Sequence, residues 1–512
     1  MRNNWEDGTP VGDDPMLTGN LHYLSTQALP NAPGIMAALP DRIDVEDVSG
    51  NSPLIQYVKS AAATGGFVWS DPQSKRDIWS DGELLRIDVD AAASTVRLSG
   101  TSTRAQADAP PMEASDSSVA RRFITGPGCT LFEACQTLGP LTASAILENL
   151  WSALSPSFIG AELLGYPMVS FGVRFDSARS SRGSAWRAWP DAFLTVPEHV
   201  CIRDQETDTT TLLRLSVGTD TRPKSVDTCG EQRMYDESAS AAWSDLEMES
   251  DWCERVASVL ETMVSSNLEK VVLARGRMGR APTGYAFDAA STIRALWPLR
   301  GDATVFSICR GDQTFLGATP EHLVRVQSGL LQTHALAGSV PSGQGDLALD
   351  DEKLLREHAH VVDAMRADIG SRASAVTAWP APQLRSAGKL LHLETELSGQ
   401  IKDGESLLSL ISALHPTPAL GGTPRAGALD WLRTNEDLER GYYGAPIGWL
   451  APNGDGVCAV GIRSALIAGE EAWSFAGAGI VEGSNPQAEW DETTLKFTTI
   501  TDRLRLCGIG DS

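Results

Sequence analysis

The segment from Ser474 to Lys496 constrains the fold of this chain more than any other stretch. Its first part, SFAGAGI, has the apolar pattern of a strand but contains Gly477 and Gly479, and glycine lets a backbone approach a ligand closely. The residues Gly-Ser-Asn-Pro at 483–486 predict a turn, with the proline placed where the first turn of a following helix tolerates it. The segment therefore predicts a strand, a tight turn and a helix in direct succession.

The helix of this segment carries charged residues on one face. Glu489, Glu492 and Lys496 stand at positions i, i+3 and i+7, so their side chains share one side of the helix. A solvated helix face is the simpler explanation of such a pattern. A strand, turn and helix that bring acids beside exposed amides are, however, a common way to build a small-molecule site. We therefore expect this face to hold a divalent cation and a carboxylated ligand.

Three other charged residues stand in unusual surroundings. Lys270 alternates with apolar residues in a predicted strand, where a lysine reaching out to water is the alternative explanation. Arg463 interrupts GVCAVGIRSALI, predicted as one strand, and a buried arginine is costly unless it pairs with an anion. Glu321 follows Thr-Pro, where it is either a site residue or a capping acid of a short helix.

Composition limits the partners of this protein. The 512 residues carry a net charge of −24 at pH 7, which disfavours nucleic acid and anionic membrane surfaces as partners. The sequence has neither a signal-like N-terminus nor an apolar run long enough to span a membrane, so we expect a cytoplasmic protein without membrane association. The eight cysteines show no zinc or disulfide spacing.

The chain is predicted to have two parts, residues 1–245 and residues 246–508. A polar segment containing proline and glycine, 219–240, precedes the boundary. The first part begins with a loose lead-in and contains the strand-like runs GFVWS, ELLRIDVD and YPMVSFGVRFD and the helical pattern SAILENLWSALSP. We expect it to support a functional second part.

Several separated motifs, from Trp252 to Arg505, resemble the chorismate-utilising enzymes, which include isochorismate, salicylate, anthranilate and aminodeoxychorismate synthases. They are GAGIVEGSNPQAEWDET, Thr-Pro-Glu ending at Glu321, Ala-Gly-Ser at 337–339, Glu-His at 357–358 and the strand of His392. The resemblance implies the family's fold, an α/β (α+β) unit in which two mostly antiparallel β-sheets pack together with helices outside. The active site is then expected between the sheets.

The resemblance also implies residue roles. Lys270 matches the general base of the members that use water as nucleophile, and Glu321 matches the general acid. Glu357, Glu489 and Glu492 are the implied ligands of Mg²⁺, and carboxylates without Cys or His favour magnesium over zinc. Tyr443, expected on a strand, and Arg463 match contacts to a substrate carboxylate. The implied substrate-binding residues are Ala337, Gly338, Ser339, His392, Thr417, Tyr443, Arg463, Gly477, Gly479 and Lys496.

These roles predict addition of water to chorismate at C2 with loss of the C4 hydroxyl. The long first part of the chain and the HPTPALGG loop resemble isochorismate synthases, which release that product. The alternative is a salicylate synthase, which makes the same intermediate and then eliminates pyruvate. Lys270 argues against an ammonia-using synthase, so no amidotransferase subunit is expected, and Ala337 replaces the nucleophilic lysine of aminodeoxychorismate synthases. An inactive chorismate binder is disfavoured because base, acid and carboxylates are all present. We expect a monomer, and the sequence leaves menaquinone and siderophore pathways open.

Overall fold

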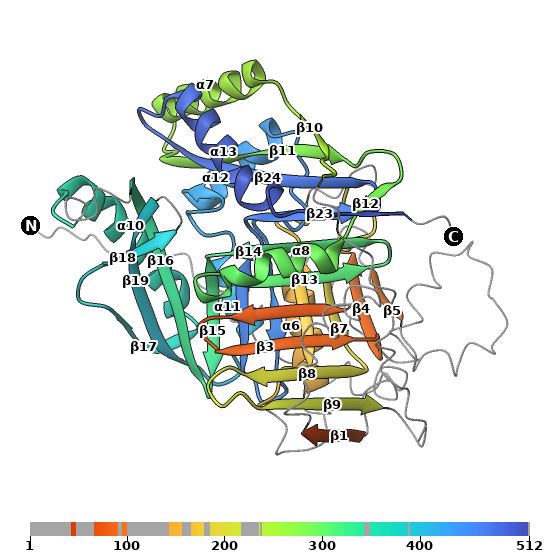
Figure 1. Ribbon diagram of the computed structural model, residues 1–512. Helices are drawn as coiled ribbons and strands as arrows, with labels where there is room; N and C mark the ends of the chain where they lie inside the picture. The colour runs from red at the N-terminus through yellow and green to blue at the C-terminus, as the bar shows by residue number, and fades with distance from the viewer. Residues whose placement is uncertain are drawn as a thin grey trace, which may run out of the picture.

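The computed structural model describes residues 42–47, 66–90, 95–99, 143–155, 165–178, 185–216, 235, 238–341, 349–387 and 390–509. Two large antiparallel sheets form the body of the molecule (Figure 1). This arrangement confirms the predicted fold class. Glu357, Ala337 and Ser339 lie within regular elements, but their side chains are outside the described part. Most of the predicted lead-in, apart from the strand at 42–47, and most of the polar segment 219–240 are outside it as well.

Among the described residues the first sheet has twelve strands, and β20 (Gly422–Thr423) pairs beside β11 near one end. The other strands follow the order β1 (Arg42–Asp47), β9 (Thr210–Ser216), β8 (His199–Asp204), β3 (Arg76–Asp81), β2 (Phe67–Asp71), β13 (Thr304–Arg310), β14 (Gln313–Thr319), β23 (Ser464–Ala468), β24 (Glu471–Val481), β11 (Lys270–Arg280) and β10 (Ala242–Asp245).

In the described part of the chain the second sheet has eleven strands, and β18 (Gln383–Ala387) pairs beside β19. The other strands follow the order β17 (Ala373–Ala378), β19 (Leu390–Ile401), β16 (Leu330–Pro341), β15 (His322–Gln327), β22 (Gly456–Val460), β21 (Pro446–Leu450), β6 (Val169–Val173), β7 (Ala192–Val196), β4 (Leu85–Asp90) and β5 (Thr95–Ser99). A separate pair joins β12 (Tyr285–Phe287) to β25 (Leu506–Gly508).

Helices lie against the sheets (Figure 1). They are α6 (Ala143–Leu154), α7 (Glu249–Ser265), α8 (Ala289–Leu296) with the 3₁₀ helix η4 (Trp297–Gly301), α10 (Glu352–Gly370), α11 (Leu407–Leu414), α12 (Arg425–Asn435) and α13 (Pro486–Thr501). The helices α7 and α13 contact each other and β24, and α10 packs on β16. None of the helices in the described ranges is long and apolar enough to cross a membrane.

The predicted strand, turn and helix at the C-terminal end are confirmed. The strand β24 pairs along its whole length with β11. Asn485 caps α13, because its side-chain oxygen accepts a hydrogen bond from the Ala488 N–H at 3.0 Å. Pro486 occupies the first helical position.

Both predicted parts of the chain contribute to both sheets. The strand β2 pairs with β13 in the first sheet, and β6 pairs with β21 in the second. The largest hydrophobic cluster contains buried residues from both sheets, among them Trp69, Phe171, Phe315 and Tyr442. The two parts therefore share one core.

The chain passes from one sheet to the other at two places that matter for the site. Thr319 ends β14 and His322 begins β15, so Glu321 lies in the first crossing. Val460 ends β22 and Ser464 begins β23, so Arg463 lies in the second. The two crossings are joined, since the Val460 N–H donates to the Glu321 carbonyl oxygen at 3.0 Å.

Three local predictions were wrong. The run GVCAVGIRSALI is two strands in different sheets, and the chain turns between them at Arg463, whose φ is +51°. Tyr443 lies in a turn before β21 rather than on the strand. The alternative of a short helix capped by Glu321 also fails, because β15 starts at the next residue.

A buried ion pair holds the first crossing. His322 Nε2 lies 3.0 Å from Asp71 Oδ1 and 2.8 Å from Thr304 Oγ1. The carboxylate also accepts hydrogen bonds at 3.0 Å from the backbone N–H groups of Gln73 and Ser74. Burial alone would raise the pKa of Asp71, but the charge of His322 and these hydrogen bonds outweigh it and lower the pKa from 3.8 to about 2.

We predict that Asp71→Asn destabilises the protein near neutral pH by about 2 kcal/mol, the free energy equivalent of this pKa shift. The folded-state pKa lies below the usual value of 3.8, so the contribution is complete above about pH 4 and disappears as the pH falls toward about 2. Urea denaturation at a series of pH values measures the free energy of unfolding and hence this contribution. The matched control is Asp208→Asn, which removes an exposed partner of Arg203 and should cost at most about 1 kcal/mol. A pH-independent difference between wild type and Asp71→Asn would contradict the assignment.

Candidate active site

A cavity of about 380 Å³ lies beside the two crossings. Its walls come from β11, β24, α13, both crossings and the turn before β21. It brings together residues that are up to 226 positions apart in the chain, from Lys270 to Lys496. The predicted site residues that line it are Lys270, Glu321, Gly338, His392, Tyr443, Arg463, Gly477, Gly479, Glu489, Glu492 and Lys496.

Thr417, a predicted substrate contact whose side chain the structure describes, does not line the cavity. It is buried in the loop before β20, and its hydroxyl has no hydrogen-bond partner among the described residues. Its carbonyl oxygen accepts the N–H groups of Leu420 and Gly421 at 3.0 and 2.9 Å. Thr417 thus shapes the loop that carries Leu420, which does line the cavity.

Gly338 lines the cavity from β16 and has a φ of +76°. The pairing of β16 with β19 shifts register between Ala337 and Ser339, so Gly338 sits in a bulge. A Cβ atom at Gly338 would lie 2.5 Å from Cδ2 of Leu354 on α10. Glycine is therefore required at this bulge for both conformation and space.

The space for the Lys270 side chain is created by Gly479. Lys270 pairs with Val481 across the β11–β24 ladder, which places Gly479 diagonally opposite on the same face. A Cβ atom at Gly479 would lie 2.7 Å from Cε and 3.3 Å from Nζ of Lys270. The absent side chain at position 479 therefore lets the ammonium lie over the strand inside the cavity.

Gly477 leaves space for the Tyr443 side chain in the same way. A Cβ atom there would lie 3.0 Å from the Tyr443 hydroxyl oxygen. The tyrosine ring stacks on Phe475, with 5.5 Å between ring centroids. Burial raises the pKa of Tyr443 to about 12, so its hydroxyl stays protonated at neutral pH and is able to donate a hydrogen bond.

Glu321 has the properties of a proton donor. Burial raises its pKa from 4.5 to about 7, although the charges of Lys270, Arg385 and Lys496 act in the opposite direction. A large fraction of this carboxyl group is therefore protonated at neutral pH. A general acid works best when its pKa lies near the operating pH.

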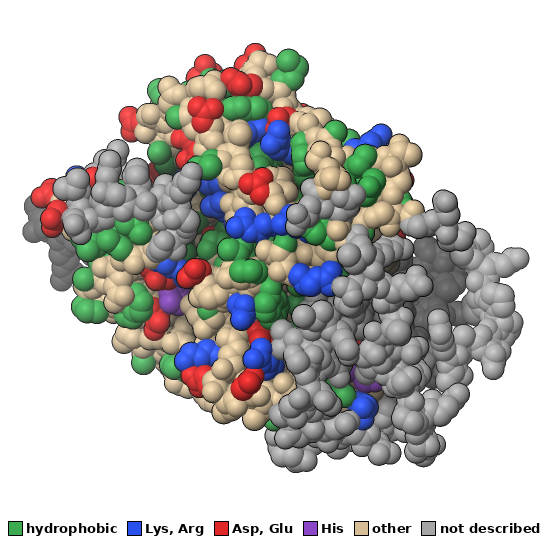
Figure 2. All heavy atoms as spheres, in the orientation of Figure 1, with side chains coloured by type: hydrophobic (Ala, Val, Ile, Leu, Met, Phe, Trp, Pro, Cys, Tyr) green, Lys and Arg blue, Asp and Glu red, His purple; other side chains and the backbone are tan. Residues whose placement is uncertain are grey.

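The cavity is rich in positive charge although the chain is acidic. Arg463 donates to Thr499 Oγ1 at 3.1 Å, and burial lowers its pKa. Burial, then the charges of Arg463 and Lys496, lower the pKa of His392, which keeps this imidazole neutral. Figure 2 shows that Asp and Glu cluster over α7 at the top, while Lys and Arg gather near the middle of that face. Such a cavity suits an anionic ligand.

The acidic residues of α13 lie at the mouth of this cavity. Lys496 Nζ lies 2.6 Å from Glu492 Oε1 and donates to the Gly477 carbonyl oxygen at 2.7 Å. Burial, with a further contribution from the Glu492 charge, raises the pKa of Glu489. No group of three metal-ligating side chains is found among the described residues, which exclude the Glu357 side chain. Glu489 and Glu492 nevertheless form an all-oxygen pair one turn apart, a donor set that fits Mg²⁺.

Two arginines in the cavity wall were missed from sequence. Arg385 lies on β18 opposite His392 on β19 and donates to Glu394 Oε1 at 2.6 Å. No motif marks it, and only the pairing of two short adjacent strands would have revealed it. Arg440 carries a visible signal, since Glu436 and Arg440 stand at i and i+4.

Comparison with known proteins gives the family. The family described as chorismate binding enzyme matches residues 142–505. The chain belongs to the chorismate binding enzymes. The salicylate biosynthesis isochorismate synthase of Pseudomonas aeruginosa is 33% identical to it over 71% of this chain and 79% of that protein.

Two other chorismate binding enzymes are similar. The isochorismate synthase MenF of Bacillus subtilis is 35% identical over 53% of this chain and 59% of that protein. The solved structure of the menaquinone-specific isochorismate synthase MenF from Escherichia coli has the same fold, with a TM-score of 0.66 and 19% identity. That alignment covers 95% of this chain and 98% of the other.

We predict that Gly479→Ala lowers chorismate turnover by about 100-fold, because the added methyl group displaces the Lys270 side chain and a displacement of about 1 Å has an effect of that size. Steady-state rates and circular dichroism measure activity and folding. Gly301→Ala is the matched control, since a Cβ there meets nothing within 4 Å. Normal turnover by Gly479→Ala would show that Lys270 does not need this space.

Proposed function

We propose that this chorismate binding enzyme is an isochorismate synthase, which converts chorismate reversibly to isochorismate. The observation that carries the proposal is the presence of Lys270 and Glu321 in one cavity, where burial raises the pKa of Glu321 to about 7. Water is the nucleophile, so no ammonia-delivering amidotransferase subunit is required. The two-part division at residue 245, the monomeric state and the cytoplasmic location stay predictions.

In this mechanism Lys270 is the general base. It takes a proton from water as the water oxygen forms a bond to C2 of chorismate. Both ring double bonds shift, the C4–O bond breaks, and Glu321 gives its proton to the departing hydroxyl group. The product is isochorismate and one water molecule is released, so atoms and charge balance. The reverse reaction uses the same two groups with their roles exchanged.

The substrate carboxylates supply the orientation. Arg463 and the Tyr443 hydroxyl bind one carboxylate, since both are donors in the cavity wall. Gly477 and Gly479 contribute space rather than side chains, so Tyr443 and Lys270 reach over the strand toward the substrate. His392 and Lys496 complete the wall, and Gly338 contributes to it from β16. The roles of Ala337 and Ser339 stay predictions. Holding both ends of the substrate in place lowers the activation free energy, by on the order of 7–11 kcal/mol for well-oriented groups.

Glu489 and Glu492, together with Glu357 from α10, would hold the Mg²⁺ that this function requires. Their oxygen donors fit a hard cation. When bound, the ion supplies positive charge that neutralises the second substrate carboxylate. Lys496 already partners Glu492 at 2.6 Å, so this carboxylate keeps a counter-ion within reach in the absence of a metal.

The product test decides the proposed function. Wild-type protein incubated with chorismate and Mg²⁺ at neutral pH should accumulate isochorismate, followed by NMR, and excess EDTA should abolish the reaction. Salicylate fluorescence and pyruvate are followed in the same sample. Sustained formation of salicylate and pyruvate in equal amounts, without a separate lyase, would replace the proposal by a salicylate synthase.

The pH dependence tests the general acid. Because Glu321 has to be protonated, kcat/KM should fall about tenfold per pH unit above about pH 7. Arg385 is one of the charges that lower the pKa of Glu321, so Arg385→Gln should move this limb to higher pH. Arg280→Gln, which removes an exposed partner of Glu471, is the matched control and should leave the limb in place. If the decline of kcat/KM above about pH 7 stayed in place in Arg385→Gln, this decline would report the titration of a group other than Glu321.

A further inference from the structure

The strand that begins with Lys270 lacks a neighbouring strand along the middle of one edge. One edge of β11 pairs with β24 throughout. The other edge pairs with β20 at Lys270 and Val271 and with β10 from Arg277 to Arg280. Between these points, among the described residues, no strand lies beside β11. Unpaired backbone groups inside a protein are costly, so their partners are informative.

Backbone groups satisfy the two ends of this stretch, because the Val272 N–H donates to the Gly421 carbonyl oxygen at 3.0 Å and the Gly276 carbonyl oxygen accepts the Leu246 N–H at 2.9 Å. Charged side chains satisfy its centre. Arg440 Nη2 donates to the Val272 carbonyl oxygen at 2.6 Å, and the Ala274 N–H donates to Glu436 Oε2 at 2.9 Å. Arg255 Nη2 donates to the Ala274 carbonyl oxygen at 3.2 Å. The pair Glu436 and Arg440 therefore takes the place of a missing strand beside the residues that follow Lys270.

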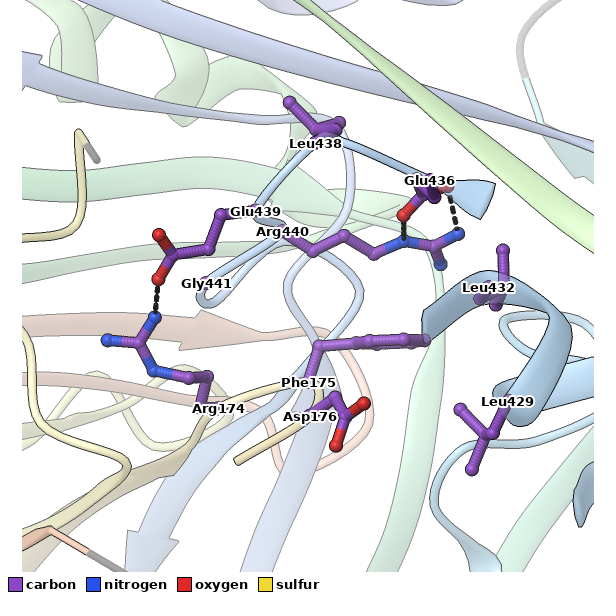
Figure 3. A pocket seen from close by; sticks show the side chains of 10 residues that line it. All are labelled: Arg174, Phe175, Asp176, Leu429, Leu432, Glu436, Leu438, Glu439, Arg440 and Gly441. Atoms are coloured by element: carbon purple, nitrogen blue, oxygen red, sulfur yellow. Dashed lines mark hydrogen bonds and ion pairs between the residues drawn. The ribbon is translucent and has the colours of Figure 1, made fainter. Parts of the chain in front are cut away.

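The Glu436–Arg440 pair is buried, and its guanidinium group makes several hydrogen bonds at once. The side chains of Arg440 and Glu436 are 5% and 2% exposed and form two hydrogen bonds of 2.6 and 2.8 Å. Arg440 Nη1 also donates to the Leu420 carbonyl oxygen at 3.1 Å, and the guanidinium lies 4.4 Å from the centre of the Phe175 ring. Figure 3 shows the Glu436–Arg440 pair on one side of a small pocket and the Arg174–Glu439 pair on the other.

Arg440 connects three parts of the catalytic cavity, which it also lines. Its side chain holds β11 two residues after Lys270 and the loop at Leu420. Its carbonyl oxygen accepts the N–H of Tyr443 at 2.8 Å. A single residue thus relates the predicted base, the loop before β20 and the predicted carboxylate contact to one another.

We propose that the Glu436–Arg440 pair is a positioning device that sets the location of Lys270 relative to the bound substrate. The inference rests on the proposed function, in which Lys270 is the base. Arg440 acts through the backbone of β11, so its effect is on the orientation of Lys270 rather than on proton transfer. A lysine in its place offers one ammonium and cannot reproduce the planar two-point contact with Glu436 together with both carbonyl contacts.

The test compares Arg440→Lys and Glu436→Gln with a matched control. Arg174→Lys alters another buried arginine of the same pocket, one that pairs with Glu439 and Asp191 and donates to the Trp189 carbonyl oxygen at 2.7 Å. Chorismate consumption and product identity are recorded well below each melting temperature. We expect kcat to fall about 100-fold in Arg440→Lys and Glu436→Gln, with KM changed less than about threefold, whereas Arg174→Lys keeps its kcat.

A double-mutant cycle separates positioning from general damage. In a Lys270→Gln background the Arg440→Lys change should lower single-turnover chorismate consumption less than about threefold, because the group that it positions is absent. The inference would be overturned if Arg440→Lys caused the same 100-fold loss in that background, or if Arg174→Lys caused an equal loss. Normal kcat in both Arg440→Lys and Glu436→Gln would overturn it as well. If the wild-type protein forms another product, only the proposed function is overturned. The ratio of chorismate consumption in each variant to that in wild type still reports positioning.

Discussion

The candidate site depends on the two places where the chain leaves one sheet and enters the other. A strand that changes sheets needs an irregular residue, and here those residues are Glu321 and Arg463. The hydrogen bond from the Val460 N–H to the Glu321 carbonyl oxygen ties the two crossings into one unit. The positions of Glu321 and Arg463, the proposed acid and carboxylate contact, consequently follow from backbone geometry, and the buried Asp71–His322 pair also holds the first crossing.

The site also depends on glycines, because the side chains that they lack leave space for other groups. Gly479 and Gly477 leave space on β24 that Lys270 and Tyr443 fill from other elements. The floor of the cavity is therefore backbone, and its functional groups reach over it from β11 and from the turn before β21. Burial then adjusts these groups in different directions, since it raises the pKa of Glu321 toward neutrality while it keeps His392 uncharged. One low-polarity environment thus produces both a proton donor and a neutral imidazole.

Sequence was sufficient for the fold class and for eleven of the residues that line the cavity, because motifs such as Thr-Pro-Glu and the β24–α13 segment keep their chemistry in short stretches. It failed where the decisive information is three-dimensional. The run around Arg463 is uniformly apolar, and nothing in it signals a positive φ or a change of sheet. Arg385 reaches the cavity through the pairing of β18 with β19, and Thr417 is buried in its loop without lining the cavity.

The pairing of β2 with β13 and of β6 with β21 has a consequence for how the protein is divided. A fragment starting at residue 246 would keep every residue of the cavity wall but would expose one long edge on β13 and another on β21. Open edges of apolar central strands recruit other chains, so such a fragment would aggregate rather than bind substrate. The first part of the chain is thus an integral component of both sheets, and insertions or fusions are better tolerated at its surface loops than at the junction between the two parts.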